Sequence, residues 1–338
     1  MKLTYTTKNS LSSIANSVKF ITTKLPFKVI VASALLVGVT GNMAMDSFVL
    51  TAPSYAKSAS KTQIRSASKR VIAKKPVNAQ REVKFKDANL EAAIRRQLNI
   101  QNDQRLTLKV LQGVKVLYTS NASIRSLEGI QALRNLTTLD LSGNPIRDVK
   151  LLAGLTNLRD LTLNFNHISD LKPLKGLTNL RRLSLYQNNI NDLKPLSGLT
   201  NLTTLTLEYN QISDVKPLAG LANLSILSLA YNQIIDVKPL LSLTKLTYLT
   251  LEYNLKIRDV KPLAGLRSLS ELGLKYNEIS DVKPLAGLTN LTTLNLYSNK
   301  ISDVEPLAGL ANLTMLELSK NPINNCQVLP EKLHYACP

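Results

Sequence analysis

A phrase of 22 residues is repeated nine times between Leu133 and Ile323. The first copy, Leu133–Gly154, reads LRNLTTLDLSGNPIRDVKLLAG. One asparagine marks the same point of every copy, at intervals of 22 residues except for a single step of 23. These asparagines are Asn144, Asn166, Asn188, Asn210, Asn232, Asn254, Asn277, Asn299 and Asn321. A chain with so constant a period folds as a row of equivalent units, each packed on its neighbours, rather than as a globular domain.

Each copy carries the apolar frame L-x-x-L-x-L-x-x-N-x-I, filled for example by Leu202, Leu205, Leu207, Asn210 and Ile212. The alternation of apolar and polar residues around its second and third leucines predicts a short strand with inward leucines. Such a strand cannot stand alone, so we expect it to pair in parallel with the equivalent strand of the next copy. The asparagine follows where the chain leaves the sheet, and its amide can both donate to and accept from buried backbone groups.

The segment that returns to the next strand carries a proline, which fixes φ and excludes a further strand there. Short 3₁₀ turns therefore fit this return better than α-helices. The prolines are Pro173, Pro195, Pro217, Pro239, Pro262, Pro284 and Pro306. An aspartate three residues before the proline, such as Asp214, is expected to accept from backbone N–H groups in the turn. The lysine that precedes the proline, such as Lys216, is expected to form a solvated stripe.

The frame is the leucine-rich repeat pattern, and the phrase I-S-D-V-K-P-L-A-G-L-T-N-L resembles the 22-residue repeats of bacterial internalins and related secreted bacterial proteins. The resemblance covers roughly residues 83–338. It implies an α/β solenoid in the form of a curved leucine-rich repeat horseshoe. The parallel β-sheet would line the concave face, short 3₁₀ or irregular segments the convex face, and the concave sheet would bind another protein.

Residues 83–113 are expected to form a helical cap over the open first repeat. Leu90, Ile94 and Leu98 recur at helical spacing behind Asp87, which is placed as an N-cap, and a second short helix is expected from 106 to about 112. The phrase F-x-D-x-N-L-E-x-A-I-R also resembles the N-terminal cap of internalin-like proteins. Residues 114–132 form a degenerate repeat, so the repeats span 114–323, and Tyr118-Thr119 leaves its inward positions ambiguous.

The N-terminal quarter carries most of the net charge of +19, because residues 1–85 hold 14 Lys and Arg against two acids. Residues 1–28 are basic and lead into a 13-residue apolar run, Val29–Gly41, as in a secretory signal. We predict a signal peptide over residues 1–56 with cleavage after Ala56. The alternative is an uncleaved membrane segment covering residues 29–50.

Residues 57–82 are Ser, Ala and basic residues with almost nothing to bury, so we expect a flexible basic linker. The alternative is an electrostatic contact with an anionic envelope surface.

The chain has two cysteines, Cys326 and Cys337, in a C-terminal cap over residues 324–338. With an export signal upstream, they predict one disulfide. In a cytosolic protein the same pair would suggest metal binding, although only His334 lies nearby. Two-cysteine tails also close many of the secreted repeat proteins that the chain resembles.

Two adjacent columns of the repeat gather aromatic residues, directly before the ladder asparagine and one step earlier, and should face the concave sheet or its rim. Tyrosine is a frequent interface anchor, but rings in these columns could equally stack on one another to cover the strand ends. The residues we predict to bind a protein are Phe165, Arg182, Tyr186, Glu208, Tyr209, Tyr231, Tyr248, Glu252, Tyr253, Glu271, Lys275, Tyr276 and Tyr297. The extra residue after Asn254 is either a tolerated loop insertion or a bulge that shapes this site.

The sequence contains no catalytic motif, phosphate-binding loop or metal-ligand cluster, so we expect no enzyme, cofactor or metal. It also lacks a nucleic-acid-binding motif. The leading hypothesis is an exported, monomeric, non-catalytic module that binds a protein, located outside the cytoplasm as a secreted or envelope protein. The alternatives are an envelope-associated structural protein held by its basic arm, and an intracellular scaffold, since similar repeats occur in phosphatase-regulatory subunits.

Overall fold

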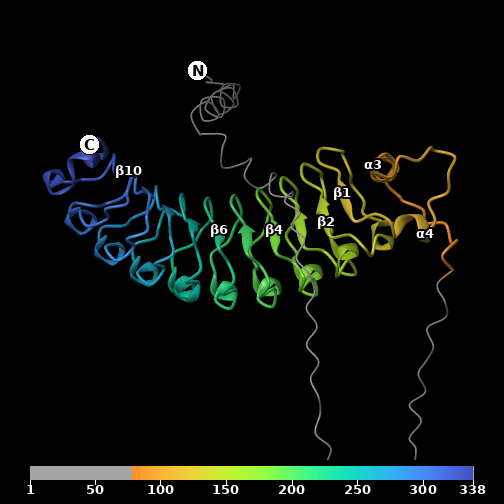
Figure 1. Ribbon diagram of the computed structural model, residues 1–338, viewed down its shortest axis with the longest axis horizontal. Coiled ribbons are helices and arrows are strands. Elements are labelled where there is room, and N and C mark those ends of the chain that lie inside the picture. The colour runs from red at the N-terminus through yellow and green to blue at the C-terminus, as the bar shows by residue number, and fades with distance from the viewer. Residues whose placement is uncertain (1–77, 338) are drawn as a thin grey trace, which may run out of the picture. The chain divides into compact units, whose positions relative to one another are not determined.

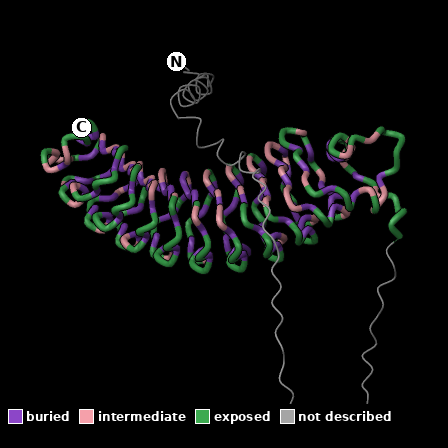
Figure 2. Tube along the Cα trace, viewed as in Figure 1, coloured by how far each residue is buried: buried purple, intermediate pink, exposed green. Residues whose placement is uncertain are grey.

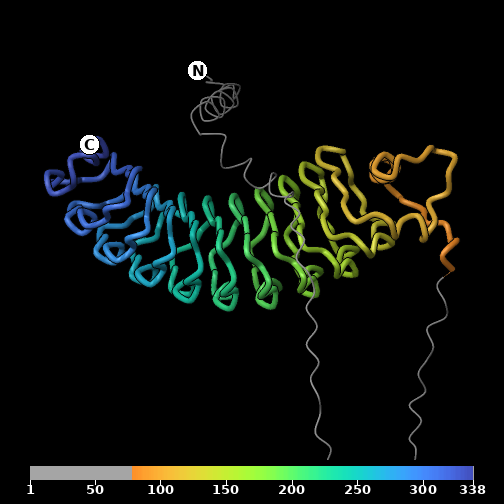
Figure 3. Tube along the Cα trace, in the orientation of Figure 1, coloured from red at the N-terminus to blue at the C-terminus, as the bar shows by residue number. Residues whose placement is uncertain are grey.

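The computed structural model describes residues 78–337, which form one curved row of stacked repeats (Figure 1). Over these residues the fold is the predicted leucine-rich repeat solenoid, with its strands on the concave side. Figure 3 shows successive repeats side by side in chain order, from the N-terminal repeats in yellow to the C-terminal ones in blue. The predicted signal peptide or membrane segment and most of the linker fall within residues 1–77, outside the described residues.

Ten parallel strands of the described residues make a single open sheet in sequence order. They are β1 (Val116–Tyr118), β2 (Thr138–Asp140), β3 (Asp160–Thr162), β4 (Arg182–Ser184), β5 (Thr204–Thr206), β6 (Ile226–Ser228), β7 (Tyr248–Thr250), β8 (Glu271–Gly273), β9 (Thr293–Asn295) and β10 (Met315–Glu317). Equivalent residues face each other across every pair, as Leu183 faces Leu205. The central leucine of each strand points inward, and its two neighbours point to the concave surface.

The core is a continuous strip of leucine, isoleucine and valine side chains that runs the length of the repeats. In Figure 2 the buried segments recur at the same point of every repeat, between the exposed convex turns and the sheet. Each repeat adds the same set of apolar side chains, as with Leu202, Leu205, Leu207 and Ile212, all 0% exposed. The hydrophobic stabilisation therefore comes from contacts between neighbouring repeats, not from any one repeat alone.

The ladder asparagines hold neighbouring repeats together as predicted. The side-chain amide of Asn210 donates to the carbonyls of Leu185 and Leu207, both at 3.0 Å. Its Oδ1 accepts from the N–H of Ile190 at 2.9 Å. One buried side chain thus satisfies backbone groups of two successive repeats, which would otherwise remain unpaired where the chain turns.

Short 3₁₀ helices line the convex side. They are Ile130–Ala132, Lys150–Leu152, Lys172–Leu174, Lys194–Leu196, Lys216–Leu218, Lys238–Ser242, Lys261–Leu263, Lys283–Leu285 and Glu305–Leu307. From Lys172–Leu174 onward, each carries its proline in the first turn, where a missing N–H is harmless. The aspartate two residues upstream accepts from the first N–H, as Asp214 Oδ1 does from Lys216 N at 2.9 Å. The predicted capping role of this aspartate column is therefore observed.

The 23-residue step interrupts the asparagine ladder at one point. Leu255 adopts a left-handed conformation with φ of 67° and is 60% exposed. The extra residue displaces the backbone, so that Ile257 N does not reach Asn277. Among the described residues, the Oδ1 of Asn277 is the one buried side-chain polar atom without a hydrogen-bond partner. The insertion is thus a bulge that removes a bond present in the regular repeats.

Helices α3 (Ala88–Leu98) and α4 (Leu108–Leu111) close the N-terminal end of the core. Asp87 Oδ1 caps α3 by accepting from Asn89 N and Leu90 N, while its Oδ2 accepts from Arg125 N at 2.7 Å. Burial tends to raise the pKa of this carboxyl, but the backbone N–H groups outweigh it and lower the pKa. A single side chain therefore both starts the helix and fastens it to the first repeat.

The first, degenerate repeat uses Leu117 as its inward strand residue. Tyr118 points outward at 64% exposure, whereas Thr119 is 3% exposed and takes the position that leucine holds in later repeats. Its hydroxyl donates to the Asp140 carbonyl at 2.9 Å, which makes burial of the polar side chain tolerable. Ordered pairing also begins before Val83, because Glu82 forms an isolated antiparallel bridge with Thr107.

The C-terminal cap consists of two 3₁₀ helices, Cys326–Val328 and Glu331–Ala336, joined by a disulfide between Cys326 and Cys337. Leu329 and Leu333 cover the end of the core. The hydroxyl of Tyr335 accepts from Leu316 N at 3.0 Å and donates to the Thr314 carbonyl at 3.1 Å. This side chain substitutes for part of a next strand at the edge of β10. None of the described helices is both long and apolar enough to cross a bilayer.

Candidate functional site: the concave face and its aromatic ladder

The residue directly before each ladder asparagine turns the chain away from the sheet in a left-handed conformation. The φ values of this column lie between 51° and 61° from Phe165 to Lys320. The first two copies have Asn121 and Gly143 here, residue types that adopt this conformation at low cost. Every later copy except Ser298 instead places a large side chain on this strained turn, which projects these side chains in a row along the rim of the concave face.

Seven aromatic rings form one uninterrupted row, which we call the aromatic ladder. Its members are Phe165, Tyr186, Tyr209, Tyr231, Tyr253, Tyr276 and Tyr297. The four central rings stack face to face, with centroids 3.9, 4.1 and 4.2 Å apart. Rings at both ends meet their neighbours at interplanar angles near 60°. The centroids of the stacked rings are therefore closer together than the strands that carry them, which are spaced at about 4.8 Å.

The ladder is continuous because it draws on both aromatic columns. Gln187 and Ser298 interrupt the left-handed column, and Tyr186 and Tyr297 from the adjacent column fill those two places. Burial, together with Tyr209 and Glu208, raises the pKa of Tyr186 to about 12. The tyrosines of the two columns therefore form one strip. Its rings stack on one another, which is the arrangement expected if they cover the strand ends, and this arrangement leaves recognition of a protein as a prediction.

Two lysines bind the C-terminal half of the ladder. Lys275 Nζ lies 5.5 Å from the ring centroid of Tyr253, and Lys320 Nζ lies 5.2 Å from that of Tyr297. Ammonium groups at this distance from a ring face are attracted by its negative π-surface. A hydrogen bond with Lys320 and one with Tyr276 lower the pKa of Tyr297. Each of these two rings therefore has an ammonium group against its face.

Carboxylates border the ladder on the sheet side. Glu252 Oε2 lies 3.2 Å from Lys275 Nζ. Glu208 has no such ion pair within residues 78–337, and burial, with the nearby charge of Glu252, raises its pKa to about 7. Burial also raises the pKa of Glu252, although Lys275 opposes the effect. Tyr248 faces Glu271 in the paired strands β7 and β8, and burial raises its pKa as well.

Not every predicted site residue belongs to this centre. Arg182 lies in β4 and forms an ion pair with Asp160 of β3 at 2.8 Å, at the N-terminal side of the stacked rings.

Sequence reasoning missed three apolar side chains at outward strand positions of the concave face. They are Tyr118, Ile226 and Met315, exposed by 64%, 38% and 57%. The alternation of each strand triplet contains the signal for them, since its first and third residues face outward.

Within residues 78–337 there is no group of three or more His, Cys, Asp or Glu side chains placed to hold a metal ion. His167 is exposed, and the Nε2 of His334 contacts the Leu329 carbonyl in the C-terminal cap. What the face offers is a long surface of aromatic edges, hydroxyl groups and charges of both signs, which suits recognition of another macromolecule.

The repeats match a known protein family. The family described as "Leucine Rich repeats (2 copies)" matches residues 134–176, 178–220, 222–265, 267–309 and 289–331. No curated protein sequence matches the chain.

Solved structures, by contrast, are similar over most of its length. An internalin from Listeria monocytogenes is 36% identical with a TM-score of 0.71, covering 74% of this chain and 75% of its own. Internalin C2 of the same species is also 36% identical, with a TM-score of 0.56, and covers 70% of this chain and 94% of its own. A leucine-rich repeat protein of Leptospira interrogans is 31% identical with a TM-score of 0.61, covering 67% of this chain and 59% of its own. The repeats, the concave sheet and these similarities together show that the chain belongs to the leucine-rich repeat family and is an internalin-like bacterial member of it.

Proposed function

We propose that this protein is an exported, non-catalytic module that binds a protein partner on its concave face, with the aromatic ladder as the central contact. Leucine-rich repeats commonly serve in protein interaction, and solenoids generally use their extended concave surfaces for it. The observation that carries the proposal is the row of seven rings along the rim of that face. The backbone turn itself does not require a ring, because the copy at Gly143 makes it with no side chain.

The ladder is suited to binding because its rings are already ordered before a partner arrives. Stacking at about 4 Å and a fixed backbone turn leave each ring few alternative rotamers, so little side-chain entropy remains to be lost on association. Neighbouring rings occupy most of the ring faces, but none of the seven aromatic residues is buried, so ring edges reach the solvent. Tyr209 is still 40% exposed and Phe165 53% exposed. Such edges combine apolar area with hydrogen-bonding groups, as interface hot spots do.

Charges around the ladder would orient the partner. The acidic group of Glu208, Glu252 and Glu271 borders its centre, whereas Lys275 and Lys320 lie against rings of its C-terminal half. Complementary charges on a partner would mainly fix its direction along the sheet and accelerate the encounter. Ten strands at about 4.8 Å give a face more than 40 Å long, ample for a standard interface of about 800 Å² per partner.

Export is the second part of the proposal. It is supported by the basic segment and apolar run of residues 1–56 and by the disulfide of the C-terminal cap, since disulfides persist in oxidising compartments. N-terminal sequencing of protein recovered from the culture medium should begin near Lys57. Envelope-bound protein that retains Met1 would instead support the membrane segment over residues 29–50.

A pair of photo-crosslinking positions tests where the partner binds. A photoreactive phenylalanine at Tyr209, on the ladder, should capture a discrete protein, whereas the same group at Lys216, on the convex side, should not. The captured protein is then titrated against Tyr253→Ala, with Lys238→Ala as the convex control. We expect the first change to weaken binding by at least tenfold, about 1.4 kcal/mol or more, and the second to leave it unaltered.

Tyr253→Phe separates recognition from packing. It retains the ring stack and removes only the hydroxyl group, so its stability should match that of the natural protein. Binding that is unchanged in both Tyr253 variants, with a stability loss in Tyr253→Ala alone, would assign the ladder to packing and move the partner site elsewhere.

A further inference from the structure

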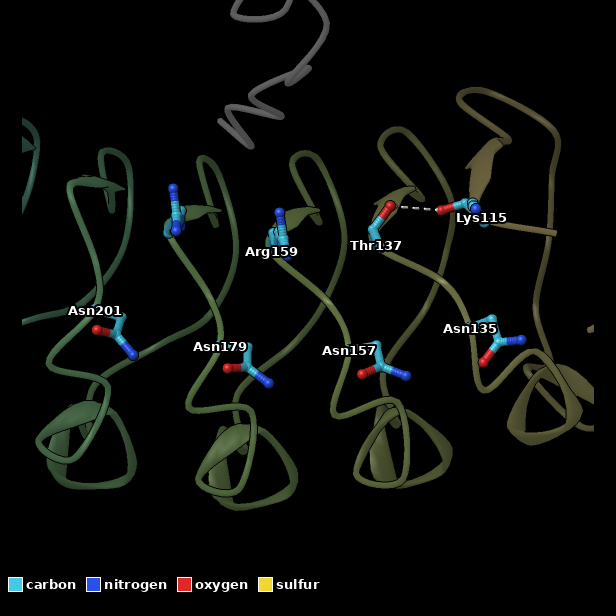
Figure 4. Close-up of a pocket in the computed structure, with 8 residues that line it drawn as sticks. Lys115, Asn135, Thr137, Asn157, Arg159, Asn179 and Asn201 are labelled. Carbon is cyan, nitrogen blue, oxygen red and sulfur yellow. Dashed lines mark hydrogen bonds between the residues drawn. The ribbon is translucent and has the colours of Figure 1, made fainter. Parts of the chain in front are cut away.

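A polar groove runs along one flank of the repeats, beside the starts of the strands, where it is separate from the aromatic ladder. Figure 4 shows its side chains in two parallel rows that cross successive repeats. The groove has a volume of about 430 Å³. One row is Lys115, Thr137, Arg159 and Arg181, and the other is Asn135, Asn157, Asn179 and Asn201. We call it the flank groove. No apolar side chain and no carboxylate lines it.

The asparagine row is fixed by the backbone of the preceding repeat. The side-chain amide of Asn157 donates to the Arg134 carbonyl at 2.9 Å, and that of Asn179 donates to the Thr156 carbonyl at 2.8 Å. Asn135 and Asn201 make the same bond at 2.9 Å. Within residues 78–337 the Oδ1 atoms of all four accept from no protein group. The row therefore presents preplaced amide oxygens that can accept hydrogen bonds from hydroxyl groups.

The basic row is unneutralised. Lys115, Arg159 and Arg181 are exposed, and none of them forms an ion pair with a residue of the described chain, 78–337. The nearest carboxylate in sequence, Asp160, is taken by Arg182 on the concave face at 2.8 Å. In the two columns that make the groove, no position in any repeat is Asp or Glu. Three like charges in one groove without counter-charges create a local field that attracts anions.

We propose that the flank groove binds an anionic polysaccharide, a sugar polymer that carries sulfate or carboxylate groups. Guanidinium groups bind such oxyanions with two parallel hydrogen bonds, and the asparagine oxygens would accept from sugar hydroxyl groups. A polymer that repeats both kinds of group along its length matches two rows of side chains that repeat at about 4.8 Å per strand. An acidic protein is the poorer fit, because the centres of protein interfaces are depleted of charge and enriched in apolar and aromatic groups, which this groove lacks.

The proposal concerns a surface other than the concave face, so the two sites would be independent. A protein bound at the aromatic ladder and a polysaccharide bound at the flank groove could be held at the same time. In that arrangement the groove would retain the protein on a polysaccharide-rich surface while the concave face remains available.

The test measures binding of the full-length protein to heparin, a sulfated polysaccharide, by calorimetry at about physiological ionic strength, where exposed charges are screened beyond about 8 Å. The variant is Arg159→Gln with Arg181→Gln. Its matched control is Lys194→Gln with Lys216→Gln, which removes the same charge from two adjacent repeats on the convex side. Neutral dextran and polyglutamate are the comparison ligands. All proteins carry the same basic N-terminal segment.

We expect the flank variant to weaken heparin binding at least tenfold and the convex control to change it less than twofold. Both variants should unfold at the same temperature as the natural protein, because the altered side chains are exposed and unpaired. Heparin should also bind more tightly than polyglutamate, and dextran should not bind. Equal weakening by the two variants would show diffuse attraction to net charge and overturn the proposal. So would no weakening by either, or polyglutamate binding that equals heparin binding and depends on the same arginines.

Discussion

Deleting Leu255 should stabilise the protein, although residue deletions inside a packed array normally destabilise it. After the deletion the chain would read Asn-Lys-Ile at this point, the same as Asn299-Lys300-Ile301 two repeats later. There Lys300 N donates to the Ile279 carbonyl at 2.8 Å, and Ile301 N donates to Asn321 Oδ1 at 3.0 Å. Both bonds are missing at the bulge.

The magnitude follows from what the bulge leaves unpaired. A buried acceptor without a partner, here Asn277 Oδ1, costs about 1–3 kcal/mol. A leucine in the left-handed region, here Leu255 at φ of 67°, adds about 1 kcal/mol of backbone strain. The deletion loses one bond in exchange, from Leu255 N to the Tyr276 carbonyl at 3.2 Å. Replacing the bulge by the regular hydrogen-bond pattern should therefore raise the free energy of unfolding by about 2 kcal/mol.

Urea unfolding followed by circular dichroism measures the free energy of unfolding, and native-state hydrogen exchange measures protection of the Ile257 amide. We expect the deletion to raise both. The control inserts a leucine between Asn299 and Lys300, which reproduces the tetrapeptide of the bulge and should orphan Asn321 Oδ1 and lower stability. A deletion variant in which the Ile257 amide becomes protected while the free energy of unfolding stays the same or falls would refute the assigned cost.

Three further changes test the site and the cap. The pKa of Glu208 is about 7 in the folded protein, above its ordinary value of 4.5. Between these two pH values the folded protein keeps a proton on Glu208 that the unfolded chain has already released. The free energy of unfolding therefore falls as the pH rises from about 4.5 to about 7. Glu208→Gln should therefore be about 1–2 kcal/mol more stable than the natural protein at pH 8 and equal to it at pH 4, as measured by thermal unfolding across pH. At position 253, whose φ is 53°, Tyr253→Gly should be more stable in urea than Tyr253→Ala by about 0.5–1 kcal/mol, although glycine is usually the destabilising choice. Cys337→Ser opens a loop with a separation of 11 residues and should cost roughly 3 kcal/mol, with hydrogen exchange accelerating first in β10 and last in β1, because only neighbouring repeats are coupled.

The sequence by itself determined the fold, because its 22-residue period is visible without any structure. A repeated frame of leucines with one asparagine per copy leaves a single way to bury every leucine, which is to stack the copies with their strands in parallel. The same local logic gave the capping role of Asp87 at α3 and the backbone bonds made by Asp214 and its equivalents. Each of these depends on residues only a few positions apart, and such contacts follow from spacing alone.

Contacts between different repeats were decided only by the tertiary structure. The columns predicted where the tyrosines would lie, but not that Tyr186 would leave its own column to fill the place beside Gln187 and keep the row of rings unbroken. They also did not reveal that Asp160 pairs with Arg182 and leaves Arg159 and Arg181 without a counter-charge. The period specifies which positions are neighbours. Which neighbour a long, flexible side chain selects depends on rotamers and on competition among charges, and both are settled only when the repeats are stacked.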